Sequence, residues 1–288
     1  MRIWKAATGI LLGFLLGACE TLSYYSQAVS GHVSILAHRD SINELLNDPG
    51  TDPALQTKLA IISNIRDFAR QELDLPVGKH YSQYVALDRA YAVWNVFAAP
   101  EFSLDPLAWC FPVAGCVSYR GYYREAGAHA FADRLAAQGN DVYTGGVAAY
   151  STLGWFTDPV LSSVINRDNW QLATLLFHEL AHQVVYIPGD TLFNESFATS
   201  VEQAGLQRWL AANNGADAAA ELQAAAQSEA RQADFVALVQ ETTRDLRVLY
   251  ASGQSEPQMR AAKAQRVQEL RESYAQLVQK WGGYTGYD

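Results

Sequence analysis

Residues 168–186 read DNWQLATLLFHELAHQVVY, and Pro188-Gly189 follows just beyond them. An apolar segment with a polar start and a Pro-Gly stop predicts a helix. Residues four apart share one face of a helix, so the imidazoles of His178 and His182 can bind one ion. Glu179 lies about 100° round the helix, beside both histidines yet free of the metal. The pattern predicts a zinc site in which Glu179 takes a proton from a water whose pKa the metal lowers.

A catalytic zinc site needs a third protein ligand and an open fourth position. After Pro188-Gly189 a second helix can run back past the first and present a carboxylate. Glu195 is the better candidate, because the twelve residues between His182 and Glu195 leave room for a helix end, a loop and a return. Glu202, about two turns further along, is the alternative, either as a ligand or as the carboxylate that holds a substrate's free amine.

Other polar residues of this region are candidates for supporting roles. Asn194 and Thr199 flank the ligand face and are expected to orient an imidazole or a carboxylate. Asp190 is a second candidate for the group that holds a substrate amine. His129 falls on a predicted helix and is expected to be structural.

The motifs resemble a known group of enzymes. His178 to Gln183 followed by Asn194 to Thr199 is similar to the glutamate zincins of the aminopeptidase N type, which pair H-E-x-x-H with a downstream N-E-x-F-A element. The spacing to Glu195 is shorter than theirs, whereas Glu202 falls near their usual distance. The sequence more closely resembles the bacterial family of predicted aminopeptidase lipoproteins, from Leu16-Gly17-Ala18-Cys19 to about Trp209. The stretches that carry this resemblance are 91–104, 109–123, 141–159 and 177–202.

The resemblance implies a zincin-like peptidase domain with one Zn²⁺ per chain and a peptide as substrate. It implies an aminopeptidase, although the sequence does not separate exopeptidase from endopeptidase action. The family continues past a segment like 281–287, which leaves open whether this chain is a C-terminally shortened member.

The N-terminus has the features of an export signal. Met1 to Lys5 carries two positive charges, and Ala6 to Leu16 is almost wholly apolar but too short to span a bilayer. Leu16-Gly17-Ala18-Cys19 then resembles the lipobox of bacterial lipoproteins, which implies a signal peptide over 1–18 and a lipid on Cys19. Several acyl chains would anchor the protein firmly. The alternative is an ordinary signal peptide with an incidental cysteine.

This resemblance predicts a lipid-anchored protein of the bacterial cell envelope that faces the periplasm. Glu20 stands where the common inner-membrane retention signal has an aspartate, which favours the outer membrane. The other two of the three cysteines, Cys110 and Cys116, are then expected to form a disulfide in an oxidising compartment. Pro112 and Gly115 supply a turn between them. Two reduced buried thiols are the alternative.

The remaining pattern predicts an α+β fold over 19–288, a single domain that is mostly helical with a small sheet at the metal cleft. Helices are expected at 30–46, 53–73, 125–138, 216–227 and 257–281, and short strands between 80 and 160. Residues 145–154, with paired glycines, are the candidate edge strand for substrate binding. Tyr150 in that segment is the first candidate for a donor to the tetrahedral oxyanion, and simple packing is an equally good account of it.

Charge excludes one class of partner. The formal net charge is -9, and lysine and arginine are scattered, so no basic face for nucleic acid is visible. The expected partners are a peptide substrate and, through the lipid, a membrane. The rival function is a non-catalytic zinc-binding envelope lipoprotein with a structural or partner-binding role, which a fourth protein ligand to the metal would favour.

Overall fold

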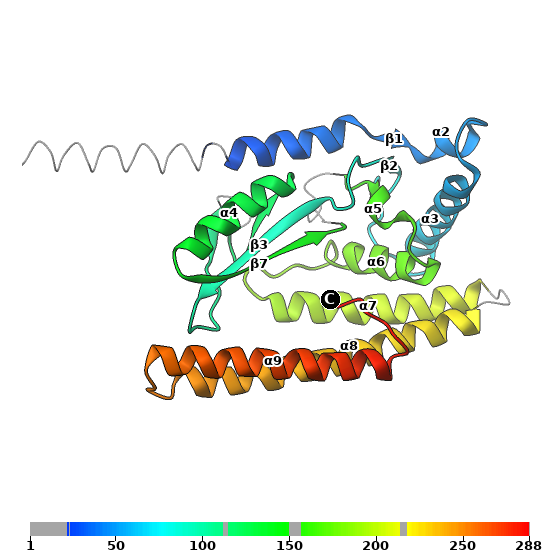
Figure 1. The fold of residues 1–288 in the computed structure, drawn as a ribbon. Coiled ribbons are helices and arrows are strands. Elements are labelled where there is room, and N and C mark those ends of the chain that lie inside the picture. The colour runs from blue at the N-terminus through cyan, green and yellow to red at the C-terminus, as the bar shows by residue number, and fades with distance from the viewer. Residues whose placement is uncertain (1–21, 23, 112–114, 150–156, 214–217, 288) are drawn as a thin grey trace, which may run out of the picture.

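The computed structural model describes residues 22, 24–111, 115–149, 157–213 and 218–287. These residues form a mostly helical α+β fold with small sheets, as the sequence predicts (Figure 1). Residues 24–37 are helical. The later helices are α2 (Ile42–Asn47), α3 (Pro53–Gln71), α4 (Glu125–Ala137), α5 (Ser162–Ile165), α6 (Asn169–Ala181), α7 (Thr191–Ala212), α8 (Ala218–Tyr250) and α9 (Glu256–Lys280).

The strands are short and form three sheets in the described part of the chain. They are β1 (Asp40–Ser41), β2 (Gln83–Val85), β3 (Val93–Pro100), β4 (Trp109–Phe111), β5 (Gly115–Val117), β6 (Arg120–Tyr122), β7 (Asn140–Val147) and β8 (Val160–Leu161). The sheet orders are β1-β2-β8, β6-β3-β7 and β4-β5. In the second sheet β3 is central and antiparallel to both neighbours, so β7 is an edge strand along its full length.

The largest core lies between α3, α6 and α7. The sequence spacing of three and four puts Leu59, Ile62 and Ile65 on one face of α3, and all three are fully buried. They pack in one cluster with Leu172, Leu176, Phe177 and Leu180 of α6 and with Leu206, Trp209 and Leu210 of α7. This packing makes α6 a rigid support for the two histidines at its C-terminal end.

A second core joins the sheet β6-β3-β7 to α4. Trp94, Val96 and Ala98 alternate along β3 and point to the face that α4 covers (Figure 1). The opposite face of β3 carries Asn95 and Phe97. Gly139, with φ of 85°, ends α4 and lets the chain enter β7 at once.

One predicted helix is wrong in its length. The sequence pattern predicts a single helix over 30–46, but Asp40 and Ser41 are extended and pair with Tyr84 and Gln83 of β2. The helical periodicity on either side of the break is real, because Ile35 and Ile42 are both buried. They belong to different clusters, and the strand pairing turns the chain between them.

The two C-terminal helices lie side by side below α7 (Figure 1). The structure confirms the predicted helix over 257–281, with a capping box formed by Ser255 and Gln258 at its start. Arg260 forms a bidentate ion pair with Glu101, at the end of the β3 strand, and ties α9 to the sheet. None of the described helices is both long enough and apolar enough to cross a bilayer.

Candidate metal centre

Helices α6 and α7 position the candidate site. A capping box between Asp168 and Gln171 starts α6, and His182 stands at its C-terminal cap, still in helical conformation. The chain turns at Gly189, with φ of 85°, and α7 runs back along α6. Gly205 permits the close approach, because a Cβ there would lie 2.9 Å from a ring carbon of Phe177.

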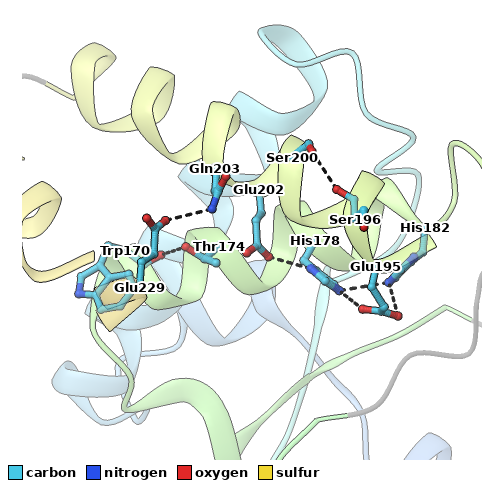
Figure 2. Close-up of polar contacts among 10 residues, drawn as sticks. All are labelled: Trp170, Thr174, His178, His182, Glu195, Ser196, Ser200, Glu202, Gln203 and Glu229. Atoms are coloured by element: carbon cyan, nitrogen blue, oxygen red, sulfur yellow. Dashed lines mark hydrogen bonds and ion pairs between the residues drawn. The ribbon is translucent and has the colours of Figure 1, made fainter. Parts of the chain in front are cut away.

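The two imidazoles and one carboxylate converge at this point (Figure 2). The Nε2 atoms of His178 and His182 lie 3.1 Å apart. Glu195 Oε2 lies 3.3 Å from His178 Nε2, and Glu195 Oε1 lies 3.7 Å from His182 Nε2. Ligand atoms of a tetrahedral zinc are about 3.3 Å apart, so these three side chains could hold one metal ion.

Glu202 contacts the other nitrogen of His178. Its Oε2 lies 2.7 Å from Nδ1, whereas Nε2 points toward Glu195 (Figure 2). Of the two carboxylates that the sequence offers as third ligand, the structure therefore places Glu195 with the Nε2 atoms. Glu202 occupies the place of a carboxylate that orients a ligating histidine.

The positions of the protons on the imidazole rings test whether a cation fits between these side chains. An ionised carboxylate only accepts hydrogen bonds, so His178 Nδ1 carries a proton and donates it to Glu202. In the neutral ring Nε2 then has a lone pair that faces Glu195 Oε2, also an acceptor, at 3.3 Å. Two acceptors at this distance need a proton, on His178, on Glu195 or shared by His182, or a cation between them, and a metal ion held by all three side chains would satisfy every one of these contacts.

The pKa values of the two histidines, without metal, move in opposite directions. The hydrogen bond to Glu202 raises the pKa of His178 above its usual value, against the effect of burial. Burial, together with the charge of His178, lowers the pKa of His182. The imidazole of His182 is thus held neutral, which is the form that binds metal.

The metal group lines one end of a cleft of about 640 Å³. Glu179 lines the same cleft, together with Asn95 of β3 and Val147 of β7. Residues 145–147 of the predicted edge segment belong to β7, and Val147 lines the cleft, whereas residues 150–154 lie outside the described residues. The glutamate stands beside the histidines but outside the metal-holding group, as its place on the helix predicts.

Asn194 does not have the expected role. Its buried side chain accepts a hydrogen bond from Ile187 N at 2.8 Å and donates one to Ile187 O at 2.9 Å. It therefore holds the loop between α6 and α7, and both of these hydrogen bonds go to the backbone of Ile187 and neither to an imidazole nor to a carboxylate. Thr199 is half-buried one turn beyond Glu195, and its orienting role stays a prediction.

The two candidates for holding a substrate amine are engaged elsewhere. Asp190 caps α7, where its Oδ1 accepts a hydrogen bond from Phe193 N at 3.0 Å. Glu202 is bonded to His178, and neither residue is among those lining the cleft. His129 lies on α4 with its Nε2 3.6 Å from Glu125; its side chain is 57% exposed and is not part of the metal group, and its structural role stays a prediction.

The remaining predictions concern the three cysteines and Tyr150. The disulfide between Cys110 and Cys116 is confirmed. Tyr150 and Cys19 lie outside the described residues, so the proposed oxyanion donor and lipid site stay predictions.

Residues that the sequence did not single out also surround the site. Tyr81, Ala149 and Glu179 line one small cavity behind the cleft, and the charges of Glu179 and of the buried Asp158 add to burial in raising the pKa of Tyr81. Tyr81 has a φ of 55°, which a sequence pattern does not reveal.

Comparison with known proteins shows the family of this chain. A family model described as "Putative aminopeptidase" matches residues 23–288. The chain belongs to this family. No curated protein matches it, and no solved structure does. Membership in this family agrees with the resemblance to predicted aminopeptidases that the sequence shows.

Proposed function

We propose that this protein is a zinc-dependent aminopeptidase anchored in the bacterial cell envelope. In this proposal His178, His182 and Glu195 hold the zinc and Glu179 is the general base. The observation that carries it is the convergence of two Nε2 atoms and one carboxylate within 3.1 to 3.7 Å, in a cleft that Glu179 also lines. Family membership supports the choice of peptide bonds as substrate.

The chain's own residues have distinct tasks in this chemistry. Zinc, when bound, would lower the pKa of water and polarise the substrate carbonyl. Glu179 accepts the proton of the attacking water and returns it to the leaving amine. Glu202 keeps Nδ1 of His178 protonated and so keeps Nε2 directed at the metal position. The free edge of β7 offers backbone groups to an extended peptide beside the cleft.

The ligand set favours catalysis over a structural zinc site. Structural sites are normally closed by four protein ligands, usually with cysteine. In the part of the chain that the structure describes, the metal-holding group has three members, and both cysteines that could contribute form a disulfide. Glu195 is 56% exposed, so the metal position opens to the cleft. These features support an open position for water and substrate.

The experiment is zinc binding combined with peptide hydrolysis. Full-length protein purified in detergent should hold about one zinc per chain, and His182→Ala should lose most of it. Glu179→Gln should keep zinc but lose about a thousandfold in hydrolysis, because the general base is removed. His129→Ala is the matched control and should keep both. Wild-type protein that takes up no zinc would refute the proposal.

The same assay separates exopeptidase from endopeptidase action. Each peptide is offered with a free and with an acetylated N-terminus. An aminopeptidase should cleave only the free form. Cleavage of both forms at internal bonds would replace the aminopeptidase assignment by that of a zinc endopeptidase.

A further inference from the structure

Beside the metal group, the cleft is lined by aromatic side chains from distant parts of the chain. Tyr24 and Tyr25 come from the helix over 24–37, Phe111 from the end of β4, and Tyr119 from the turn before β6. We call these four residues the aromatic wall. They line the same cleft as His178, Glu179, His182 and Glu195.

The aromatic wall is a packed structure. The rings of Tyr24 and Phe111 stack at 5.6 Å with an interplanar angle of 28°, and Tyr25 meets Phe111 edge-on at 6.3 Å. Arg120 lies behind the wall, with its guanidinium 4.1 Å from the centroid of the Tyr24 ring. These contacts give the rings fixed positions, as a preformed binding surface requires.

The disulfide holds Phe111 in the wall. Cys110 and Cys116 are directly opposed in the β4-β5 pair, and Phe111 follows Cys110. Val117, which follows Cys116, lines the cleft as well. The hairpin therefore presents two apolar side chains to the cleft from one covalently closed unit.

Charge in the cleft is confined to its metal end. Among the described residues that line it, the acidic and basic side chains are His178, Glu179, His182 and Glu195. The aromatic wall offers ring faces and edges, with the tyrosine hydroxyls as its polar groups. Burial raises the pKa of Tyr119, so its hydroxyl stays neutral at ordinary pH. An acidic substrate side chain would lose its hydration against these ring faces, whereas an apolar one would gain by burial.

We propose that the aromatic wall binds a large apolar side chain, aromatic or branched aliphatic, of the peptide residue next to the scissile bond. The position of this residue next to a scissile bond rests on the proposed function, whereas the preference for an apolar side chain does not. The wall shares one cleft with the metal group and Glu179, so a side chain bound on it belongs to a residue near the reacting carbonyl. The substrate class is thus peptides with phenylalanine, tyrosine, leucine or a similar residue at the cleavage point.

The first test measures binding in the absence of turnover. Zinc-loaded full-length Glu179→Gln protein is titrated with alanine peptides that carry a single phenylalanine, leucine, alanine or aspartate, and binding is followed by calorimetry. The phenylalanine and leucine peptides should bind at least about tenfold more tightly than the alanine and aspartate peptides. Equal affinity for all four peptides, or a preference for aspartate, would overturn the proposal.

The second test removes part of the wall. Phe111→Ala, in the same Glu179→Gln background, should lose about tenfold in affinity for the phenylalanine peptide and little for the alanine peptide. Phe111→Leu keeps an apolar side chain and should retain most of the preference, which separates loss of the wall from loss of the fold. Tyr284→Ala is the matched control, since Tyr284 is an exposed ring after the end of α9 that is not among the cleft residues.

Hydrolysis by the otherwise wild-type protein separates this inference from the proposed function. If the protein cleaves peptides, kcat/KM should follow the same order, and Phe111→Ala should lower it for the phenylalanine and leucine peptides but not for the alanine and aspartate peptides. Selective binding without any hydrolysis would refute the proposed peptidase activity. The aromatic wall would then remain a binding site for apolar peptide side chains. Hydrolysis of all four peptides with equal kcat/KM would refute the proposed role of the aromatic wall, while the proposed peptidase activity would stand.

Discussion

The two ring nitrogens of His178 have different partners, and this separation organises the site. Nδ1 donates to Glu202 at 2.7 Å, while Nε2 faces His182 and Glu195. A carboxylate on the far nitrogen fixes the tautomer and orientation of a ligating imidazole and increases its basicity. Glu202 is only 18% exposed, so its charge is not fully screened by solvent. The residue thus acts on the metal through His178.

Glu202→Gln should weaken zinc binding by roughly ten- to a hundredfold at neutral and higher pH, because the imidazole becomes less basic. The hydrogen bond to Glu202 is the largest cause of the raised His178 pKa, and the substitution should therefore lower that pKa. Protons compete with zinc only below the histidine pKa, so the fall in affinity on acidification should begin at lower pH in the variant.

Competition with a zinc chelator over a pH series measures both effects. Glu229→Gln is the matched control, since Glu229 on α8 bonds only to Gln203 among the contacts in Figure 2 and should not change zinc affinity. A variant that binds zinc as well as wild type would show that Glu202 does not support the metal ligand.

At the scale of elements, the connection from α6 to α7 decides where Glu195 lies. The loop between them is held by Asn194, whose amide bonds both backbone groups of Ile187. Gly205 then lets α7 approach Phe177 of α6 closely. Because Glu195 follows Asn194 directly, the residue that holds the loop also fixes the first turn of the ligand helix.

Asn194→Ala should destabilise the protein by about 2 kcal/mol, because the N–H and C=O of Ile187 lose the partner that the buried Asn194 side chain supplies. Zinc affinity should fall as well, since the loop that positions Glu195 loosens. Urea unfolding with and without zinc measures the two effects. Asn213→Ala, which removes a bond to Trp209 O at the exposed far end of α7, should cost clearly less. Equal losses in both variants would contradict this account.

At the scale of the whole molecule, the cleft combines segments from across the chain. The helix over 24–37, the β4-β5 hairpin, the sheet and α6 all line it. Tyr24 stands five residues after Cys19, a span of at most about 18 Å. If Cys19 carries the lipid, the cleft therefore faces a region close to the membrane surface.

Cys19→Ser should abolish incorporation of labelled fatty acid, because acylation needs the thiol. The wild-type protein should take up label and fractionate with the envelope, with the outer membrane as the expected location. Fractionation alone does not decide, since the uncleaved apolar segment of the variant can hold it in the inner membrane. Unlabelled wild-type protein that is released with the periplasmic contents would refute the lipid anchor.

The local features of the candidate site could be predicted from the sequence. The spacing of four between His178 and His182 places both on one helix face because 3.6 residues make a turn. The same periodicity predicts α3, α4 and α9 closely, and two cysteines six residues apart predict the disulfide. These features depend on interactions within one element, which neighbouring residues determine.

Contacts between distant elements were decided only by the tertiary structure. The sequence favours Glu195 over Glu202 only through the length of the connection, and the packing of α7 on α6 determines which one meets the Nε2 atoms. In the sequence Asn194 is next to the candidate ligand Glu195, and only the tertiary structure shows that its side chain is bonded to Ile187. The aromatic wall has no sequence signature, because its members come together only when the N-terminal helix and the β4-β5 hairpin pack against the sheet. Long-range packing involves surfaces from segments far apart in the chain, and a local pattern contains no record of which surfaces will meet.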